Sequence, residues 1–185
     1  MIFVIQELQQ VLRRRLDLVN YFKQTPSVET VPIVSPVFVL GLGRSGTTYL
    51  HRLLSLDPTV RAPSMWELVR PVPKVGIATP AQHLADRKAR ADDIKKVLGV
   101  RRMLGDRTLD DFHEIGFDLP EECLFALSDE MPFSFHYVYT CMLNCDDFLG
   151  SVDHAQRLRA YRSYKKVLPS LTHTHTHTPL LLHQQ

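Results

Sequence analysis

The chain has 185 residues, with 22 lysines and arginines against 20 aspartates and glutamates and a formal net charge of +2. This length is typical of one domain with a sizeable core, and the small net charge gives no strong preference for polyanions or membrane surfaces. The longest apolar run is too short to cross a bilayer, and 3 cysteines suit a reducing compartment. These features favour a cytoplasmic protein without a membrane span.

An amphipathic helix is predicted over residues 5–23, where apolar side chains recur at helical spacing. The arginine triplet at 13–15 is expected on a solvated face of this helix, so no nucleic-acid partner is predicted. Three prolines at 26, 32 and 36 then interrupt the chain before the first strand.

The most informative stretch is residues 37–48, Val-Phe-Val-Leu-Gly-Leu-Gly-Arg-Ser-Gly-Thr-Thr. It predicts an apolar strand over 37–40, a glycine-rich turn and a helix over 47–56 that Asp57 and Pro58 end. Glycines let the backbone turn tightly and present successive N–H groups. Because the helix start adds the positive end of its dipole, the turn is predicted to bind an anion.

Polar side chains in the same turn can hold phosphate- or sulfate-like oxygens. Arg44 supplies a cation, and hydroxyl groups come from Ser45, Thr47 and Thr48. Two alternatives stay open at this stage: Arg44 is a surface arginine of a turn, or the two threonines cap the helix.

Glycine spacing allows two other nucleotide-binding interpretations. Gly41 and Gly46 fit the frame of a nucleotide P-loop, but Thr47 stands where that motif requires lysine. With Gly43 they also spell the dinucleotide fingerprint of a Rossmann-type enzyme, which requires an acidic residue about 20 positions on. Glu67 lies near that distance, but the segment before it does not have the pattern of a buried strand.

Residues 37–51, ending Thr-Thr-Tyr-Leu-His, resemble the 5′-phosphosulfate-binding loop of sulfotransferases that use 3′-phosphoadenylyl sulfate (PAPS). The similarity continues through 53–73 and 118–123 and fades after 160–168. These blocks look like the branch that contains many bacterial sulfotransferases and their animal relatives. The resemblance implies an α/β, P-loop-like sulfotransferase fold with a parallel sheet flanked by helices, truncated and helix-rich in the part present.

By this resemblance, the chain transfers a sulfuryl group from PAPS, its co-substrate, to a hydroxyl or amine of a small-molecule acceptor. Arg44 would hold the transferring group and stabilise the leaving phosphate. This chemistry requires no metal. The resemblance assigns cofactor binding to Gly43, Arg44, Ser45, Gly46, Thr47 and Thr48.

A general base must deprotonate the acceptor, and two residues are candidates. Glu67 resembles the glutamate base of some bacterial relatives, and His113 lies at a distance from the loop comparable to the base histidine of cytosolic relatives. The alternative for Glu67 is a capping box with Ser64. The alternative for His113 is a structural role, and His51 is expected to be a packing or surface residue.

Further helices are predicted after the resemblance to the loop ends. A charged amphipathic helix is expected over 82–104, ending near Gly105. Pro120-Glu121-Glu122 predicts a helix start with acids in its first turn. Two more helices are expected over 121–145 and 153–168.

The chain closes on a strict Thr-His alternation over 172–178 followed by Pro-Leu-Leu-Leu-His-Gln-Gln. Alternating histidines can bind metals, but a translated dinucleotide repeat also gives this pattern. We therefore expect residues 1–168 to be the N-terminal part of a sulfotransferase domain and 169–185 to be a disordered tail. The arginine and serine that hold the 3′-phosphate in relatives have no matching block, so an inactive fragment is a further alternative.

Overall fold

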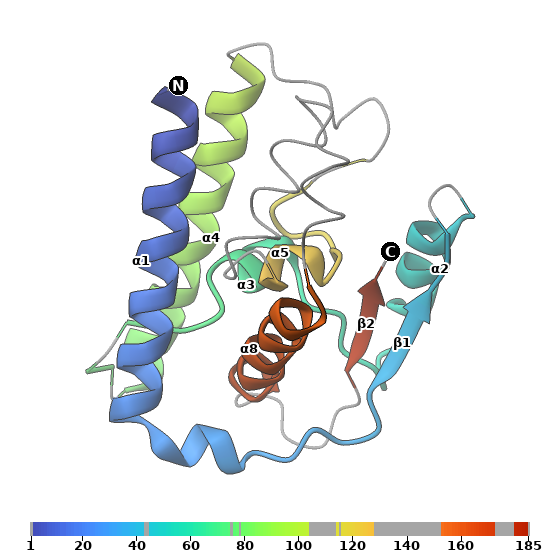
Figure 1. Ribbon diagram of the computed structural model, residues 1–185, viewed down its shortest axis with the longest axis horizontal. Helices are drawn as coiled ribbons and strands as arrows, with labels where there is room; N and C mark the ends of the chain where they lie inside the picture. Colours follow the sequence, from blue (N-terminus) through green and yellow to red (C-terminus); the bar gives the residue numbers. More distant parts are fainter. Residues whose placement is uncertain are drawn as a thin grey trace.

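The structure is a computed structural model of the chain, in which short strands lie among helices (Figure 1). It describes residues 2–42, 45–74, 76–77, 79–103, 114, 116–127, 153–172 and 180–184.

The N-terminal helix α1 spans Ile2–Gln24 and is followed by a short 3-10 helix, η1, at Pro26–Thr30. The prediction of a helix over 5–23 is therefore confirmed. Arg13 and Arg15 are exposed as predicted, but Arg14 is buried, so a wholly solvated triplet is wrong. Helical spacing explains this, because position 14 shares a face with the buried Val11 and Tyr21.

The predicted strand–turn–helix unit is present. Strand β1 spans Val37–Leu40, and helix α2 spans Thr47–Leu54, two residues shorter than expected. Three of the four β1 residues are exposed, and Val39 is buried. An uncharged apolar strand of this kind is typical of the interior of a parallel sheet.

A second strand, β2, spans Leu181–Gln184 and pairs in parallel with β1, with Val37 opposite Leu181 and Leu40 opposite Gln184. This differs from the disorder expected over 169–185; residues 173–179 and 185 lie outside the described residues. The physical reason is the leucine run, since Leu180 and Leu182 are both buried in the main core while the backbone of β2 bonds to β1.

Helix α8, His154–Thr172, supplies five of the eleven buried residues of the main core and runs four residues past its predicted end. Its buried side packs with the short helix α5, Leu124–Leu127, and with residues of α3 and β2. The core cluster consists of Leu68, Cys123, Ala126, Leu127, Ala160, Tyr164, Val167, Leu168, Leu171, Leu180 and Leu182.

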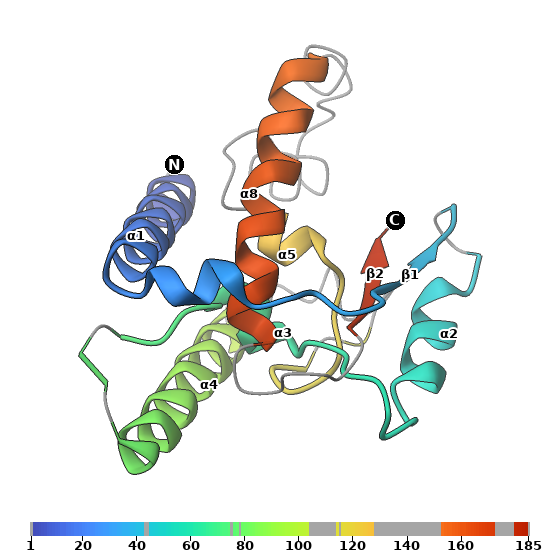
Figure 2. The same cartoon turned by 90° about the horizontal axis from the view of Figure 1, so that it is seen from below.

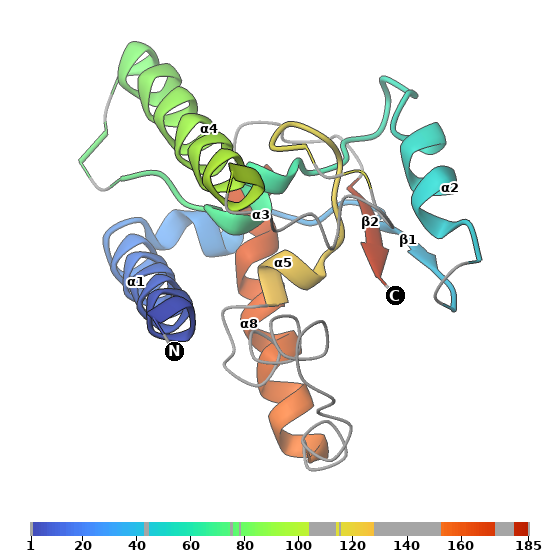
Figure 3. The ribbon, with the colours of Figure 1, turned by 90° about the horizontal axis from the view of Figure 1, so that it is seen from above.

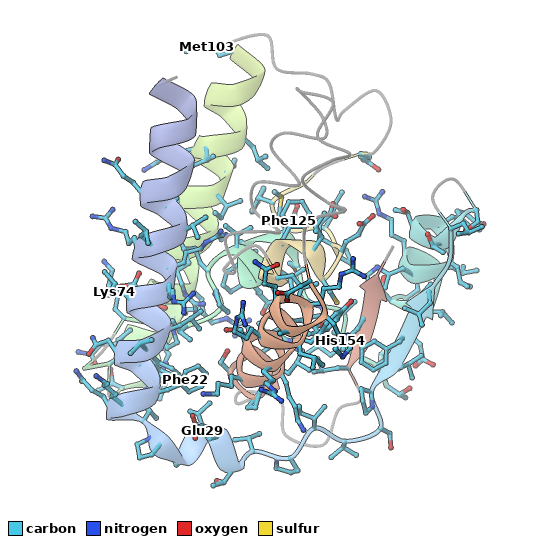
Figure 4. The ribbon with its side chains drawn as sticks, in the orientation of Figure 1. Phe22, Glu29, Lys74, Met103, Phe125 and His154 are labelled. Carbon is cyan, nitrogen blue, oxygen red and sulfur yellow. The ribbon has the colours of Figure 1, made fainter. Side chains whose placement is uncertain are left out.

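Helix α3 spans Met65–Val69, and α4 spans Pro80–Met103, close to the predicted 82–104. Phe125 of α5, labelled in Figure 4, packs against the main core and against a smaller cluster around Met65 and Ile94. This one aromatic ring therefore links the α3–α4 side of the molecule to α8.

The predicted helix start at Pro120 is wrong, because α5 begins at Leu124. Pro120 forms an isolated bridge with Ser64, and the Glu121 N–H donates to the carbonyl of Pro63 at 3.2 Å. The chain is therefore extended here, and Glu121 is buried instead of lying in a first helical turn. The remainder of the helix expected over 121–145 lies outside the described residues.

The sheet in the described residues has two parallel strands, and most of the other described elements are helices. The structure is therefore helix-rich, as expected from the resemblance. All three ribbon views place α2 on one side of the β1–β2 pair and α3, α5 and α8 on the other (Figures 1, 2 and 3). None of the described helices combines the length and the apolar character needed to cross a bilayer.

Packing of β2 into the core can be measured by one substitution. Leu182 is 1% exposed, so Leu182→Ala should lower the free energy of unfolding by about 3 kcal/mol. Leu84 on α4 is 69% exposed, and Leu84→Ala should change it by less than about 0.5 kcal/mol. Urea unfolding followed by circular dichroism gives both values, and equal values would show that β2 is not part of the core.

Candidate functional site

The turn between β1 and α2 leads directly into the N-terminus of a helix. Gly46 is the N-cap of α2 and has a left-handed φ of 84°, a conformation that favours glycine. The first N–H groups of a helix have no acceptor within the helix, so the N–H of Thr48 can donate to an anion at this end. The sequence therefore builds a helix terminus suited to a phosphate or sulfate group.

Gly41 is required by a close approach within the same turn. A Cβ atom at this position would lie 2.5 Å from Cγ2 of Thr47 and 2.8 Å from Oγ of Ser45. The chain thus doubles back on the end of β1. The Ser45 hydroxyl donates to the Leu42 carbonyl at 2.6 Å, which stabilises this turn.

The other predicted anion ligands differ in burial, and some of them lie outside the described residues. Thr47 is buried and Thr48 is half-buried, both in the first turn of α2. Because Gly46 is the N-cap residue, the alternative in which a threonine caps the helix is wrong. Gly43, Arg44 and His113 lie outside the described residues.

His51 follows Thr47 by one helical turn and is buried among its neighbours. This agrees with the packing role expected for it.

Among the described residues, no three or more histidines, cysteines, aspartates and glutamates are grouped in a way that could hold a metal ion. Cys123, in the core, forms a 2.7 Å hydrogen bond with the Tyr164 hydroxyl, and burial raises the pKa of Tyr164.

Glu67 forms the capping box that the sequence offered as its alternative role. Its Oε2 accepts from the Ser64 N–H at 2.9 Å, while the Ser64 side chain accepts from the Glu67 backbone. Its Oε1 pairs with the guanidinium of Arg61. Both side chains are only 13% exposed, so the ion pair is largely buried.

Arg61 was not singled out from the sequence, but in the structure it is the largely buried partner of Glu67. Burial lowers the pKa of its guanidinium, the nearby charge of Glu67 raises it, and Arg87 lowers it further. A largely buried cation of this kind depends on its carboxylate partner. No local sequence signal marks the pair, because Arg61 and Glu67 are six positions apart and the chain between them is not helical throughout.

A second arginine lies close to Glu67. Arg90 donates from Nε to Asp86 at 2.7 Å and from a terminal nitrogen to the Arg70 carbonyl at 2.6 Å. Its guanidinium lies 5.0 Å from the ring centroid of Trp66. Burial lowers the pKa of Arg90, and Asp86 is the strongest opposing influence. The Asp86–Arg90 pair has the i, i+4 spacing that could have identified it from sequence.

Arg61 and the glycine turn lie at opposite ends of β2, and because the bridge of Arg61 is parallel, the chain that follows Arg61 runs in the direction of the turn. Arg61, which begins the Glu67 segment, forms a bridge with Leu180 immediately before β2. The turn instead follows Leu40, whose register partner is Gln184 at the far end of β2. Four strand residues separate these positions, a length of about 13 Å.

Substitution of Gly41 tests the close approach in the turn. Gly41→Ala should lower the free energy of unfolding by about 2 kcal/mol, because its methyl group would overlap Thr47. Gly99 in α4 has no atom within 4 Å of an added Cβ, so Gly99→Ala should stabilise the chain by up to about 1 kcal/mol. Thermal and urea unfolding measure both changes, and a stabilising Gly41→Ala would refute this turn geometry.

Comparison with solved structures finds two mycobacterial proteins with this fold. Sulfotransferase STF9 from Mycobacterium avium superposes with a TM-score of 0.69 over 98% of this chain and 44% of its own. Sulfotransferase STF1 from Mycobacterium tuberculosis H37Rv gives a TM-score of 0.62 over 96% of this chain and 46% of its own. Each is 24% identical in sequence, and the chain spans less than half the length of either.

A comparison with curated proteins gives no match. The family model described as "Sulfotransferase family" matches residues 36–176, which includes β1, the glycine turn, α2 and the segment around Glu67. The match covers more than half of the sequence and agrees with the structural similarity. The chain belongs to the sulfotransferase family.

Proposed function

We propose that this chain provides the 5′-phosphosulfate-binding part of a cytoplasmic, PAPS-dependent sulfotransferase. The carrying observation is the turn between β1 and α2, where Gly41 and Gly46 give the backbone its sharp reversal and α2 begins. Family membership supports the choice of PAPS over other anionic ligands. The acceptor would be a small molecule with a hydroxyl or amine group.

In this proposal, the backbone N–H groups at the start of α2 and the hydroxyl of Thr48 donate to the 5′-phosphate of PAPS. The helix dipole favours negative charge at the same point. Arg44 would balance charge that develops on the leaving phosphate and on the transferring group. Because guanidinium is a poor proton donor, Arg44 would act through charge rather than by protonating the leaving group.

For the general base, contacts in the structure favour a structural role for Glu67. Both of its carboxylate oxygens are engaged, one with Arg61 and one with the Ser64 N–H. A base needs a free oxygen that reaches the acceptor. We therefore propose His113 as the base to test first, with Glu67 as the second candidate.

Only the 5′ side of the cofactor is proposed to bind here, because the resemblance includes no block for the 3′-phosphate. The solved relatives are more than twice as long as the matched part. Turnover and acceptor choice are therefore proposed for a complete enzyme. A Rossmann-type or P-loop enzyme that uses the same turn would bind NAD or ATP instead.

Ligand choice distinguishes these alternatives. Isothermal titration of the chain with 3′-phosphoadenosine 5′-phosphate, the desulfated product of PAPS, should show binding that exceeds that of ATP and NAD. Arg44→Ala should weaken it by about tenfold or more, since a charge-assisted hydrogen bond is lost. Arg13→Ala, an exposed arginine on α1, is the matched control and should leave the affinity unchanged. Preference for ATP or NAD would contradict the proposal.

A second pair of variants separates the two roles of Glu67. Glu67→Gln keeps a capping-box side chain but removes the charge that faces Arg61, so unfolding should become easier by about 3 kcal/mol. The control is Asp93→Asn, whose pair with Arg70 is long at 3.3 Å and half exposed; it should cost less than about 1 kcal/mol. Unchanged stability of Glu67→Gln would contradict the structural role of this carboxylate and would favour its role as the base.

A further inference from the structure

The outward face of α8 carries a concentration of positive charge that the glycine turn does not explain. The helix has no acidic residue, and all its lysines and arginines are exposed. They are Arg157, Arg159, Arg162, Lys165 and Lys166. Three of them, Arg162, Lys165 and Lys166, lie within an arc of about 100°, and we call these three side chains the α8 cationic face.

The overall charge of the protein conceals this asymmetry. Without the five cations of α8, 17 lysines and arginines remain against 20 acidic residues, so the rest of the chain has a formal charge of −3. Of the long helices, α8 has the largest net charge, since α4 has seven lysines and arginines but also three aspartates. A field of this kind attracts an anionic surface to that helix.

The cations of α8 are not neutralised within the described part of the chain. On the α3–α4 side, Arg90 pairs with Asp86 and Arg70 pairs with Asp93. No member of the α8 cationic face forms an ion pair in the described ranges. Asp153, immediately before the helix, accepts from the Gln156 N–H at 2.6 Å and so forms part of the helix start.

Helix geometry places cationic and apolar side chains together on this side of α8. Taking 100° per residue, Arg162, Lys165 and Lys166 share an arc of about 140° with Leu158 and Tyr161. Leu158 and Tyr161 are 41% and 42% exposed, so apolar surface lies between the cations. The opposite side of the helix is fixed in the core.

We infer that the α8 cationic face docks on an anionic lipid surface. Clustered lysines and arginines attract acidic headgroups, while tyrosine and leucine are favourable at the boundary between headgroups and acyl chains. A nucleic acid would use the cations but would leave Leu158 in water. Because the apolar side of α8 is buried in the core, contact is peripheral, and the helix does not enter the bilayer.

Vesicle co-sedimentation tests this inference. The chain should bind phosphatidylcholine vesicles that contain phosphatidylserine and should not bind phosphatidylcholine alone. Binding should disappear between about 0.1 M and about 1 M salt, where the screening length falls from about 10 Å to about 3 Å. Equal binding to both kinds of vesicle would overturn the inference.

Charge reversal identifies the surface that binds. The triple variant Arg162→Glu, Lys165→Glu, Lys166→Glu should weaken vesicle binding by about tenfold or more. The matched control reverses three exposed cations on other helices, Arg13→Glu, Lys88→Glu and Lys96→Glu, with the same change in net charge. The control should lose less than about threefold, because its charges lie outside the contact area; an equal loss in both triples would refute the α8 site.

Two further measurements distinguish a loss of binding from a loss of folding, and lipid from nucleic acid. If charge reversal on α8 prevents cooperative thermal unfolding, the neutral double variant Lys165→Gln, Lys166→Gln replaces it and should still weaken binding. Leu158→Ser should weaken vesicle binding by about threefold without changing the affinity for double-stranded DNA. Tighter binding to DNA than to the acidic vesicles, unaffected by Leu158→Ser, would assign the face to nucleic acid and overturn the lipid inference.

Discussion

Parallel pairing of β1 with β2 is the constraint on which the rest of the structure depends. It satisfies backbone groups along one edge of β1 and brings Leu180 and Leu182 into the core that α8, α5 and α3 share. Backbone polar groups in a buried sheet need such partners. The same pairing fixes the direction in which β1 delivers the glycine turn to the start of α2.

Local patterns in the sequence were sufficient to predict β1, the long helices and the capping box of Glu67. The strand over 37–40 and the long helices followed from apolar spacing, and the capping box of Glu67 followed from residue types three positions apart. Each of these signals acts within a few residues. The turn was equally clear, because glycine is required where φ is positive or another atom lies very close.

The features that were missed depend on contacts between distant segments. β2 lies in a leucine-rich segment that follows the Thr-His repeat. The extended conformation of β2 becomes favourable only when β1 is present to pair with it. Pro120 looked like a helix start, but its bridge to Ser64 keeps the chain extended. The Arg61–Glu67 pair likewise depends on a fold that buries both groups together, and propensity does not report burial.

Sequence distance also decides when the core can form. Val37 and Leu181, partners in the sheet, are 144 positions apart. During synthesis, β1 would therefore leave the ribosome about 10 s before β2 is made. Throughout that interval an uncharged, apolar strand lacks its partner, which is the kind of segment that molecular chaperones retain. The long separation between β1 and β2 thus makes the pairing slow to form and leaves β1 open to aggregation until β2 is available.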